Sequence, residues 1–198
     1  RVNPITLIGK GEIDHGQRDY IKESSALIGP CWLMRRELLE TVGYFDEQFF
    51  PVQHEDIDYC LRARLAGYKI IYNGRVKVWH KSLFRDGGEC ERNFEKFKKK
   101  WEKTFARFPL ADAHPADLGY AKAFTFFCQQ QYDACIKELK RVGQMDPRFT
   151  DPLLMGRALV AKKAYSRGIT CLREAVALSP VNDRARYRLA QGLAEAGH

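Results

Sequence analysis

The chain has 198 residues, of which 45% are hydrophobic and 12% aromatic, and its formal net charge is +8. This length allows one large domain or two small ones, and the composition is that of a folded globular protein. It contains no apolar run long enough to cross a membrane and no signal-peptide pattern, and its basic balance favours anionic partners.

The six cysteines are Cys31, Cys60, Cys90, Cys128, Cys135 and Cys171. They form no C-x-x-C pair and no zinc-ligand spacing, and most of them replace apolar residues in periodic segments. This usage predicts a reducing compartment, and therefore a cytoplasmic protein. Because the sequence starts without methionine, we expect it to lie inside a longer polypeptide.

Residues 5–84 alternate short apolar runs with short helical patterns, which is typical of an α/β fold. Two of the expected helices end at glycine, the residue that favours the backbone conformation just past a helix C-terminus. Asn73-Gly74 predicts a turn between two strands. The expected strands are residues 25–34, 68–72 and 75–79, and the expected helices are residues 35–43 and 57–66.

The sequence His54-Glu55-Asp56-Ile57-Asp58 lies at the start of the second of these helices. Acidic residues at a helix N-terminus act as caps and gain from the helix dipole, and Asp58 and Arg62 have the spacing of an ion pair on the helix surface. One carboxylate is enough for a cap, however. Since Glu55 and Asp56 follow a loop rich in aromatic residues, we expect one of them to face a cleft as a general base.

His80 follows the expected strand 75–79, a place from which side chains often turn into a site. A single histidine is more often structural than a metal ligand, so spacing alone does not assign His80 a role. The sequence around His54 gives even less indication of a metal ligand than that around His80.

Residues 89–107 predict an amphipathic helix. Its lysines are typical of a solvated helix face, and peripheral contact with a membrane is the alternative. We expect no nucleic-acid partner, because no recognised nucleic-acid-binding motif is present. The apolar face consists of Phe94, Phe97, Trp101, Phe105 and Phe108.

The sequence from residue 116 onward is helical in pattern and repeats itself. Tyr132 and Tyr165 lie 33 residues apart, and so do Pro147 and Pro180. This pattern resembles tetratricopeptide repeats, two nearly complete and the first helix of a third. The resemblance implies antiparallel helix pairs whose concave groove binds a protein partner. The small residues expected where helices approach most closely are Ala123, Gly156 and Ala190, which are followed by apolar Phe126, Leu159 and Leu193.

Several stretches of the first half occur together in the order and spacing of another family. They are GEIDHGQRDY (11–20), IGPCWLMRRELLETVGYFDEQFF (28–50), EDIDYCLRARLAGYKIIY (55–72), VKVWHKS (76–82) and NFEKFKKKW (93–101). Together they resemble the second half of a family 2 glycosyltransferase with the GT-A fold. The order and spacing are similar to those of bacterial enzymes that build rhamnose-containing and other surface polysaccharides.

This resemblance implies an inverting transfer from a nucleotide-sugar donor to a hydroxyl of a saccharide or glycoconjugate acceptor. Asp56 would be the catalytic base with Glu55 beside it, and His80 would help to hold a divalent metal, Mn²⁺ or Mg²⁺. Trp32 would offer a stacking surface to a sugar on the acceptor side, with core packing as the alternative. Gln17, in the first motif, would bind substrate.

The nucleotide-binding half of that family, with its Asp-x-Asp motif, has no counterpart in the sequence. Residues 56–58 spell Asp-x-Asp at a helix start, which is too late in the chain. We therefore expect part of a GT-A domain over residues 1–108, a linker over 109–115 and tetratricopeptide repeats over 116–198. As a fragment it is expected to be inactive, not to bind nucleotide sugars, and to self-associate through an open sheet edge. A repeat-based interaction module with a relic transferase half is the alternative.

Overall fold

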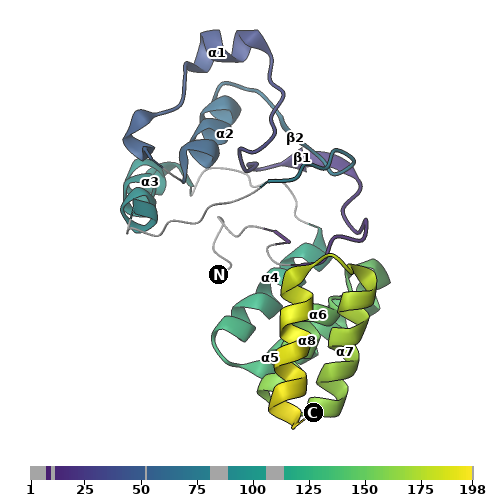
Figure 1. Ribbon diagram of the computed structural model, residues 1–198. Coiled ribbons are helices and arrows are strands. Elements are labelled where there is room, and N and C mark those ends of the chain that lie inside the picture. Colours follow the sequence, from purple (N-terminus) through teal and green to yellow (C-terminus); the bar gives the residue numbers. More distant parts are fainter. Residues whose placement is uncertain (1–7, 10–11, 52, 81–88, 106–113, 198) are drawn as a thin grey trace. The chain divides into compact units, whose positions relative to one another are not determined.

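The computed structural model describes residues 8–9, 12–51, 53–80, 89–105 and 114–197. Within these ranges the protein is mostly helical, with eight α-helices and a two-stranded sheet (Figure 1). The chain divides into two compact units, which are described separately: residues 19–112, and residues 1–18 together with 113–198. Residues 12–18, which lie in the expected first domain of residues 1–108, group with the helical unit.

The described part of the unit of residues 19–112 contains three α-helices and the sheet. Strand β1 pairs with β2 in antiparallel register, so that Ile21 lies opposite Asn73 and Ser24 opposite Ile70. Its elements are β1 (Ile21–Ser24), α1 (Arg36–Val42), the 3-10 helix η1 (Glu47–Phe49), α2 (Glu55–Leu65), β2 (Ile70–Asn73) and α3 (Glu89–Phe105).

The helices of this unit begin and end close to the predicted residues. Helix α1 ends at Gly43 with φ 79°, and the turn after α2 contains Gly67 with φ 86°. Both angles lie in the left-handed region, which glycine adopts without a steric penalty. The local signals of periodicity and terminal glycine were therefore sufficient for these two helices.

Two of the predicted strands are wrong. Residues 25–34 form an irregular loop. In this loop the backbone oxygen of Ile28 accepts a hydrogen bond from the Trp32 side chain, and the N–H of Gly29 donates one to the Asp56 side chain. Residues 75–79 form no strand, and β2 pairs with β1. Strand β1, which the apolar pattern did not indicate, takes the place of both as the partner of β2.

The core of this unit is mainly aromatic. Tyr59 of α2 packs with Leu38 of α1 and with Ala63, and all three are buried. On α3, Phe97 and Trp101 are 0% and 4% exposed, which confirms the predicted apolar face for these residues. The Phe105 side chain and Phe108 lie outside the described part of the chain.

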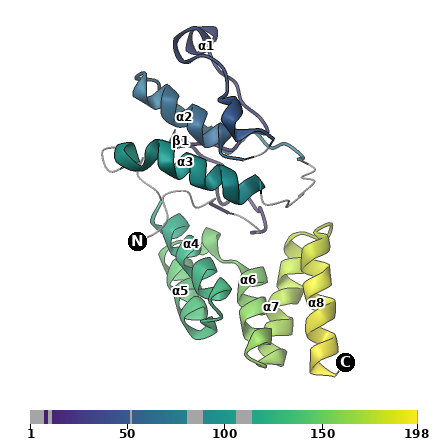
Figure 2. The same ribbon diagram turned by 90° about the vertical axis from the view of Figure 1, so that its left-hand side faces the viewer.

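In the second unit the described residues form five α-helices, which follow one another along the chain. Helix α4 packs against α5, α6 against α7, and α7 against α8 (Figure 2). The elements are α4 (Pro115–Cys128), α5 (Tyr132–Met145), the 3-10 helix η2 (Pro147–Phe149), α6 (Pro152–Ala161), α7 (Tyr165–Leu178) and α8 (Asp183–Ala196).

Positions 33 residues apart are buried in the same way in the two helix pairs. An added Cβ at Gly156 would lie 2.7 Å from Cγ of Leu172, so the close approach predicted there is confirmed. Ala190 is exposed, and the prediction for it is wrong, because no described helix follows α8 to cover it. The buried equivalent pairs are Ala123 and Gly156, Cys135 and Gly168, Leu139 and Leu172, and Val142 and Ala175.

Residues 12–18 pack on these helices. The side chain of Ile13 belongs to the core cluster that contains Leu153 of α6 and Ala185 of α8. Arg18 donates from Nε to Oδ1 of Asp117 on α4, at 2.8 Å. The segment before β1 is therefore part of the core of the helical unit.

Candidate functional site

The start of α2 is the candidate site, and Asp56 is its best-fixed carboxylate. The backbone N–H of Gly29 donates to Oδ2 of Asp56 at 3.1 Å, and the N–H of Ile57 donates to Oδ1 at 2.7 Å. Gly29 is 27 residues away in sequence, so this bond joins the loop 25–35 to the helix. Asp56 lies in the first turn of α2, where the helix dipole stabilises negative charge.

The turn before α2 has an uncommon backbone conformation. Gln53 and His54 have φ of 68° and 75°, a left-handed conformation that is uncommon for residues other than glycine. The His54 ring packs against Phe94 and Phe97 of α3, with centroids 5.6 and 5.3 Å away. Half-burial lowers the pKa of His54, against the attraction of Asp56, and favours a neutral ring.

Glu55 differs from Asp56 in its hydrogen bonding. Its Oε2 is buried and has no hydrogen-bond partner among the described residues. Burial raises the pKa of Glu55, and the charge of Asp56 raises it further. Glu55 therefore takes up a proton more readily than an exposed glutamate, whereas both oxygens of Asp56 accept backbone hydrogen bonds.

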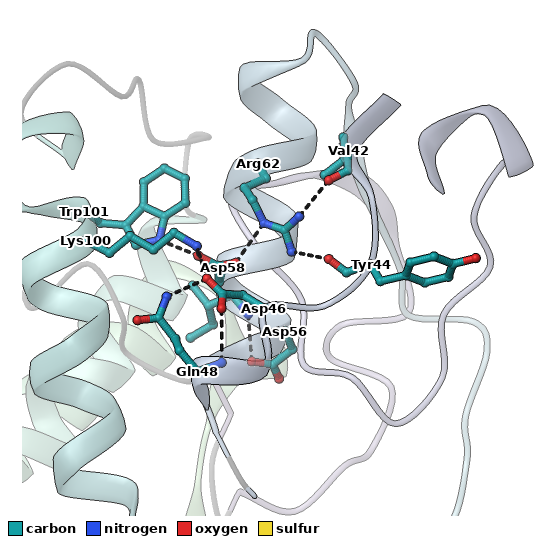
Figure 3. A network of polar contacts seen from close by, with 10 residues as sticks. Val42, Tyr44, Asp46, Gln48, Asp56, Asp58, Arg62, Lys100 and Trp101 are labelled. Atoms are coloured by element: carbon teal, nitrogen blue, oxygen red, sulfur yellow. Dashed lines mark hydrogen bonds and ion pairs between the residues drawn. The ribbon is translucent and has the colours of Figure 1, made fainter. Parts of the chain in front are cut away.

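Asp58 is the centre of a network of polar contacts below the start of α2 (Figure 3). Its side chain is 0% exposed, and Oδ2 accepts from Nε of Arg62 at 2.8 Å. Oδ1 lies 2.7 Å from Nζ of Lys100 and accepts from Nε1 of Trp101 at 2.8 Å. The predicted pair of Asp58 and Arg62 is confirmed, but its predicted place on the helix surface is wrong, because α3 covers it.

The partners of Asp58 extend this network to other elements. Arg62 also donates to the backbone oxygens of Val42 and Tyr44, each at 2.8 Å. Lys100 reaches Oδ2 of Asp46 at 2.7 Å. Although burial raises the pKa of Asp46, hydrogen bonds from Lys100 and Gln48 lower it to about 2. The network joins α2 to α3, to η1 and to the loop after α1.

Trp32 packs within the loop and the core. Its Nε1 donates to the oxygen of Ile28 at 2.7 Å, and its ring lies 5.8 Å from that of Phe45 and 6.0 Å from that of Tyr59. The side chain is half-buried. These contacts agree with the packing alternative, and part of the ring stays accessible.

Gln17 and His80, the other predicted site residues, lie in different surroundings. Gln17 belongs to the helical unit and is 2% exposed. Among the described residues, its side chain donates to the oxygen of Ile13 and accepts from the N–H of His15. His80 is exposed and belongs to no strand. In the described ranges, no three His, Cys, Asp or Glu side chains are arranged to hold a metal ion.

Lys100, Trp101 and Gly29 belong to the site but were not found by sequence reasoning. Lys100 and Trp101 lie on the predicted amphipathic helix, whose lysines are expected to face solvent. Their contact with Asp58 spans up to 43 residues of sequence and depends on how α3 packs. The helical spacing of Trp101 was the signal that could have placed it near α2.

Comparison with known proteins gives little further information. No protein-family profile matches the chain, and no solved structure matches it. A stretch of 86 residues is 28% identical to a protein of Sinorhizobium fredii (strain NBRC 101917 / NGR234) named "Uncharacterized protein y4gI". The match covers 39% of this chain and only 10% of that protein. Among the described residues, no helix has the length and apolarity needed to cross a membrane.

Proposed function

We propose that this chain forms the acceptor side of an inverting family 2 glycosyltransferase of the GT-A fold, joined to tetratricopeptide repeats. In this proposal Asp56 is the catalytic base, and Glu55 tunes the charge beside it. The substrates are a nucleotide sugar and a saccharide or glycoconjugate with a free hydroxyl. The proposed transfer also requires a nucleotide-binding part, which the candidate site described above does not supply.

The contact between Gly29 and Asp56 carries the proposal. The family resemblance assigns residues 29–36 to the acceptor side and Asp56 to proton removal, from separate stretches of sequence. A hydrogen bond of 3.1 Å joins the two. A base must lie within hydrogen-bonding distance of the hydroxyl that it deprotonates, so a loop that holds both the acceptor and the base is what the reaction needs.

In the proposed step, the carboxylate of Asp56 removes the proton from the acceptor hydroxyl while the hydroxyl oxygen attacks the anomeric carbon. The bond from that carbon to the nucleotide diphosphate breaks, and the nucleotide leaves with the bonding electrons. The N–H groups of Gly29 and Ile57 hold the carboxylate in position throughout. No step is assigned to Mn²⁺ or Mg²⁺, because exposed His80 does not form a metal site with the described carboxylates.

The test is Asp56→Asn in the longest natural polypeptide that contains this sequence. General base catalysis typically contributes about 100-fold to 10,000-fold, so transfer should fall at least about 100-fold. Binding of the nucleotide-sugar donor, measured by calorimetry, should be unchanged. Glu55→Gln serves as the matched control and should reduce transfer less. Transfer by Asp56→Asn within tenfold of the wild type would rule out Asp56 as the base.

A second function is proposed for the helix pairs α4–α5 and α6–α7 with α8, namely binding a protein partner. Their buried small residues repeat every 33 positions, which is the arrangement expected of stacked repeats. This role does not depend on glycosyl transfer.

A further inference from the structure

The loop 25–35 is joined to α2 at two points that lie one helical turn apart. The N–H of Leu27 donates to Sγ of Cys60 at 3.4 Å, and the thiol of Cys60 donates to the oxygen of Leu27 at 3.8 Å. The N–H of Gly29 donates to Oδ2 of Asp56 at 3.1 Å. Asp56 and Cys60 are four residues apart on α2, so their side chains lie on the same face of the helix.

The spacing of the two contacts agrees in the helix and in the loop. Four residues of an α-helix span about 6 Å, and two residues of a loop span at most about 7 Å. The stretch from Leu27 to Gly29 therefore follows one turn of α2 with both contacts formed. Because Cys60 holds Leu27, Gly29 has less freedom, and less entropy is lost when its N–H binds Asp56.

The residue between the two contacts is also held by a side chain. The oxygen of Ile28 accepts from Nε1 of Trp32 at 2.7 Å. The Trp32 ring lies 6.0 Å from the ring of Tyr59, which directly precedes Cys60 on α2. Residues 27, 28 and 29 thus each have a backbone hydrogen bond to a side chain.

Cys60 has the properties that the contact with Leu27 requires. It is 3% exposed, and burial raises the pKa of its thiol to about 11, against the effect of the Leu27 N–H. The charge of Asp56 also raises this pKa, and that of Arg64 lowers it. The thiol therefore keeps its proton at neutral pH, and a neutral thiol both donates and accepts hydrogen bonds. A buried cysteine often acts only as a small hydrophobe, but this one also bonds both backbone groups of Leu27.

The bond between Gly29 and Asp56 needs such support, because water competes with an exposed hydrogen bond. Gly29 is exposed, and Ile28 beside it is 51% exposed. We propose that Cys60 is a positioning residue for Asp56: it holds Leu27 and thereby keeps the N–H of Gly29 on the carboxylate. This inference rests on the proposed function for its effect on transfer, whereas its effect on the Gly29 amide is measured without any transfer.

The first test measures hydrogen exchange of the Gly29 amide by NMR in the whole chain. Cys60→Val fills the space without a hydrogen bond, and Cys60→Ser keeps the hydrogen bonds in a smaller side chain. Exchange of the Gly29 amide should become about threefold faster or more in Cys60→Val and should stay within about twofold of the wild type in Cys60→Ser. A role in packing alone predicts the opposite order, because serine leaves space that valine fills.

Cys135→Val is the matched control, since it makes the same change at a buried cysteine of the helical unit. It should leave exchange of the Gly29 amide within about twofold of the wild type. Thermal melting by circular dichroism checks that each variant is folded. Cys60→Ala removes the hydrogen bonds without adding volume, so it gives the same measurement should Cys60→Val fail to fold.

The second test measures transfer in the longest natural polypeptide that contains this sequence. Cys60→Val should lower kcat about threefold or more and leave KM for the nucleotide-sugar donor within about twofold, and Cys60→Ser should restore kcat. A wild-type kcat in Cys60→Val, while Asp56→Asn is inactive, would overturn the proposal.

The exchange measurement separates this proposal from the assignment of the base. The proposal is wrong if the Gly29 amide exchanges at the wild-type rate in Cys60→Val, or if Cys60→Ser exchanges as fast as Cys60→Val. If Asp56→Asn retains transfer, the base assignment fails, and the exchange rates still decide whether Cys60 positions the Asp56 carboxylate.

Discussion

At the scale of single residues, Asp58 combines complete burial with three charged or polar partners. Removing its carboxylate takes away the ion-pair partner of Arg62 and leaves Lys100 with Asp46 alone. Breaking a buried ion pair from one side typically costs about 3–5 kcal/mol. We therefore expect Asp58→Ala to lower the free energy of unfolding by about 3 kcal/mol or more in urea titrations.

Asp46→Ala is the control for this prediction. Asp46 shares Lys100 but is 29% exposed, so its pair is better solvated, and the main loss is the cap on η1. That variant should cost about 1 kcal/mol. Equal costs for the two variants would show that the buried position of Asp58 adds nothing to the network.

The Glu12 side chain is only 3% exposed and lies close to a guanidinium. It pairs with Arg18 at 2.5 Å, but Arg18 also binds Asp117. Burial raises the pKa of Glu12 to about 7 against the attraction of Arg18, and the carboxylates of Asp151 and Asp117 also raise it. Arg18 therefore forms ion pairs with more than one carboxylate and compensates Glu12 only in part, so the folded unit favours a protonated Glu12.

This predicts a stability that falls as the pH rises. Because the folded pKa lies above the ordinary value of 4.5, the folded state binds more protons between that value and about 7. The contribution is complete below about pH 4.5 and is lost as the pH rises through about 7, on the order of 1–3 kcal/mol. Glu12→Gln should remove this slope in denaturant titrations from pH 4.5 to 8.

The matched control is Glu23→Gln, which changes a half-exposed carboxylate that pairs with Lys69 at 3.7 Å. It should keep the slope of the wild type. A wild-type stability that rises over this interval would mean that Glu12 is ionised in the folded chain.

The sequence predicted the position of the candidate base but not what surrounds it. Glu55 and Asp56 fall at the start of α2 because helix start signals are local. The N–H of Gly29 reaches Asp56 only after the loop 25–35 folds back, and Trp101 reaches Asp58 only after α3 packs. Long-range contacts of this kind leave no periodic signal in the chain.

At the scale of elements, helices were predicted better than strands for a physical reason. A helix satisfies its backbone hydrogen bonds within its own segment, so its periodicity and its terminal glycine are sufficient. A strand needs a partner, and β2 pairs with residues 21–24, about 50 residues before it, and not with residues 75–79. The apolar alternation of residues 75–79 was genuine, but no strand of the described chain pairs with it.

The helix pairs give a direct test of the 33-residue register. Gly156 lies against α7, where an added Cβ would come within 3.0 Å of the backbone oxygen of Gly168. Because a backbone atom cannot move aside easily, Gly156→Leu should lower the free energy of unfolding by about 1–3 kcal/mol or more. Differential scanning calorimetry would record this as a lower melting temperature.

Ala190→Leu is the matched control, because Ala190 occupies the equivalent position on α8 but is exposed. It should change stability by less than about 0.5 kcal/mol. If both variants were neutral, the close contact between α6 and α7 would be absent in solution.

At the scale of the whole molecule, the unit of residues 19–112 leaves much apolar surface in contact with water. Within the described residues β1 pairs only with β2, so each strand has one edge without a strand partner. Open edges and exposed aromatic side chains favour association between copies. The most exposed large side chains there are Leu33 at 102%, Trp79 at 93%, and Tyr44 and Phe50 at 81% each.

We therefore expect the chain to self-associate, with a mass in sedimentation equilibrium that rises above 22.9 kDa as concentration increases. The net charge of +8 opposes contact between copies, so association should strengthen between low salt and physiological salt, as screening reduces that repulsion. Trp79→Lys should weaken association because it replaces an exposed ring near the sheet with a charge. Val181→Lys, at a position that is 84% exposed on the helical unit, adds the same charge elsewhere and should have less effect. A mass that stays at 22.9 kDa at every concentration and salt would show that these edges and rings are compatible with a monomer.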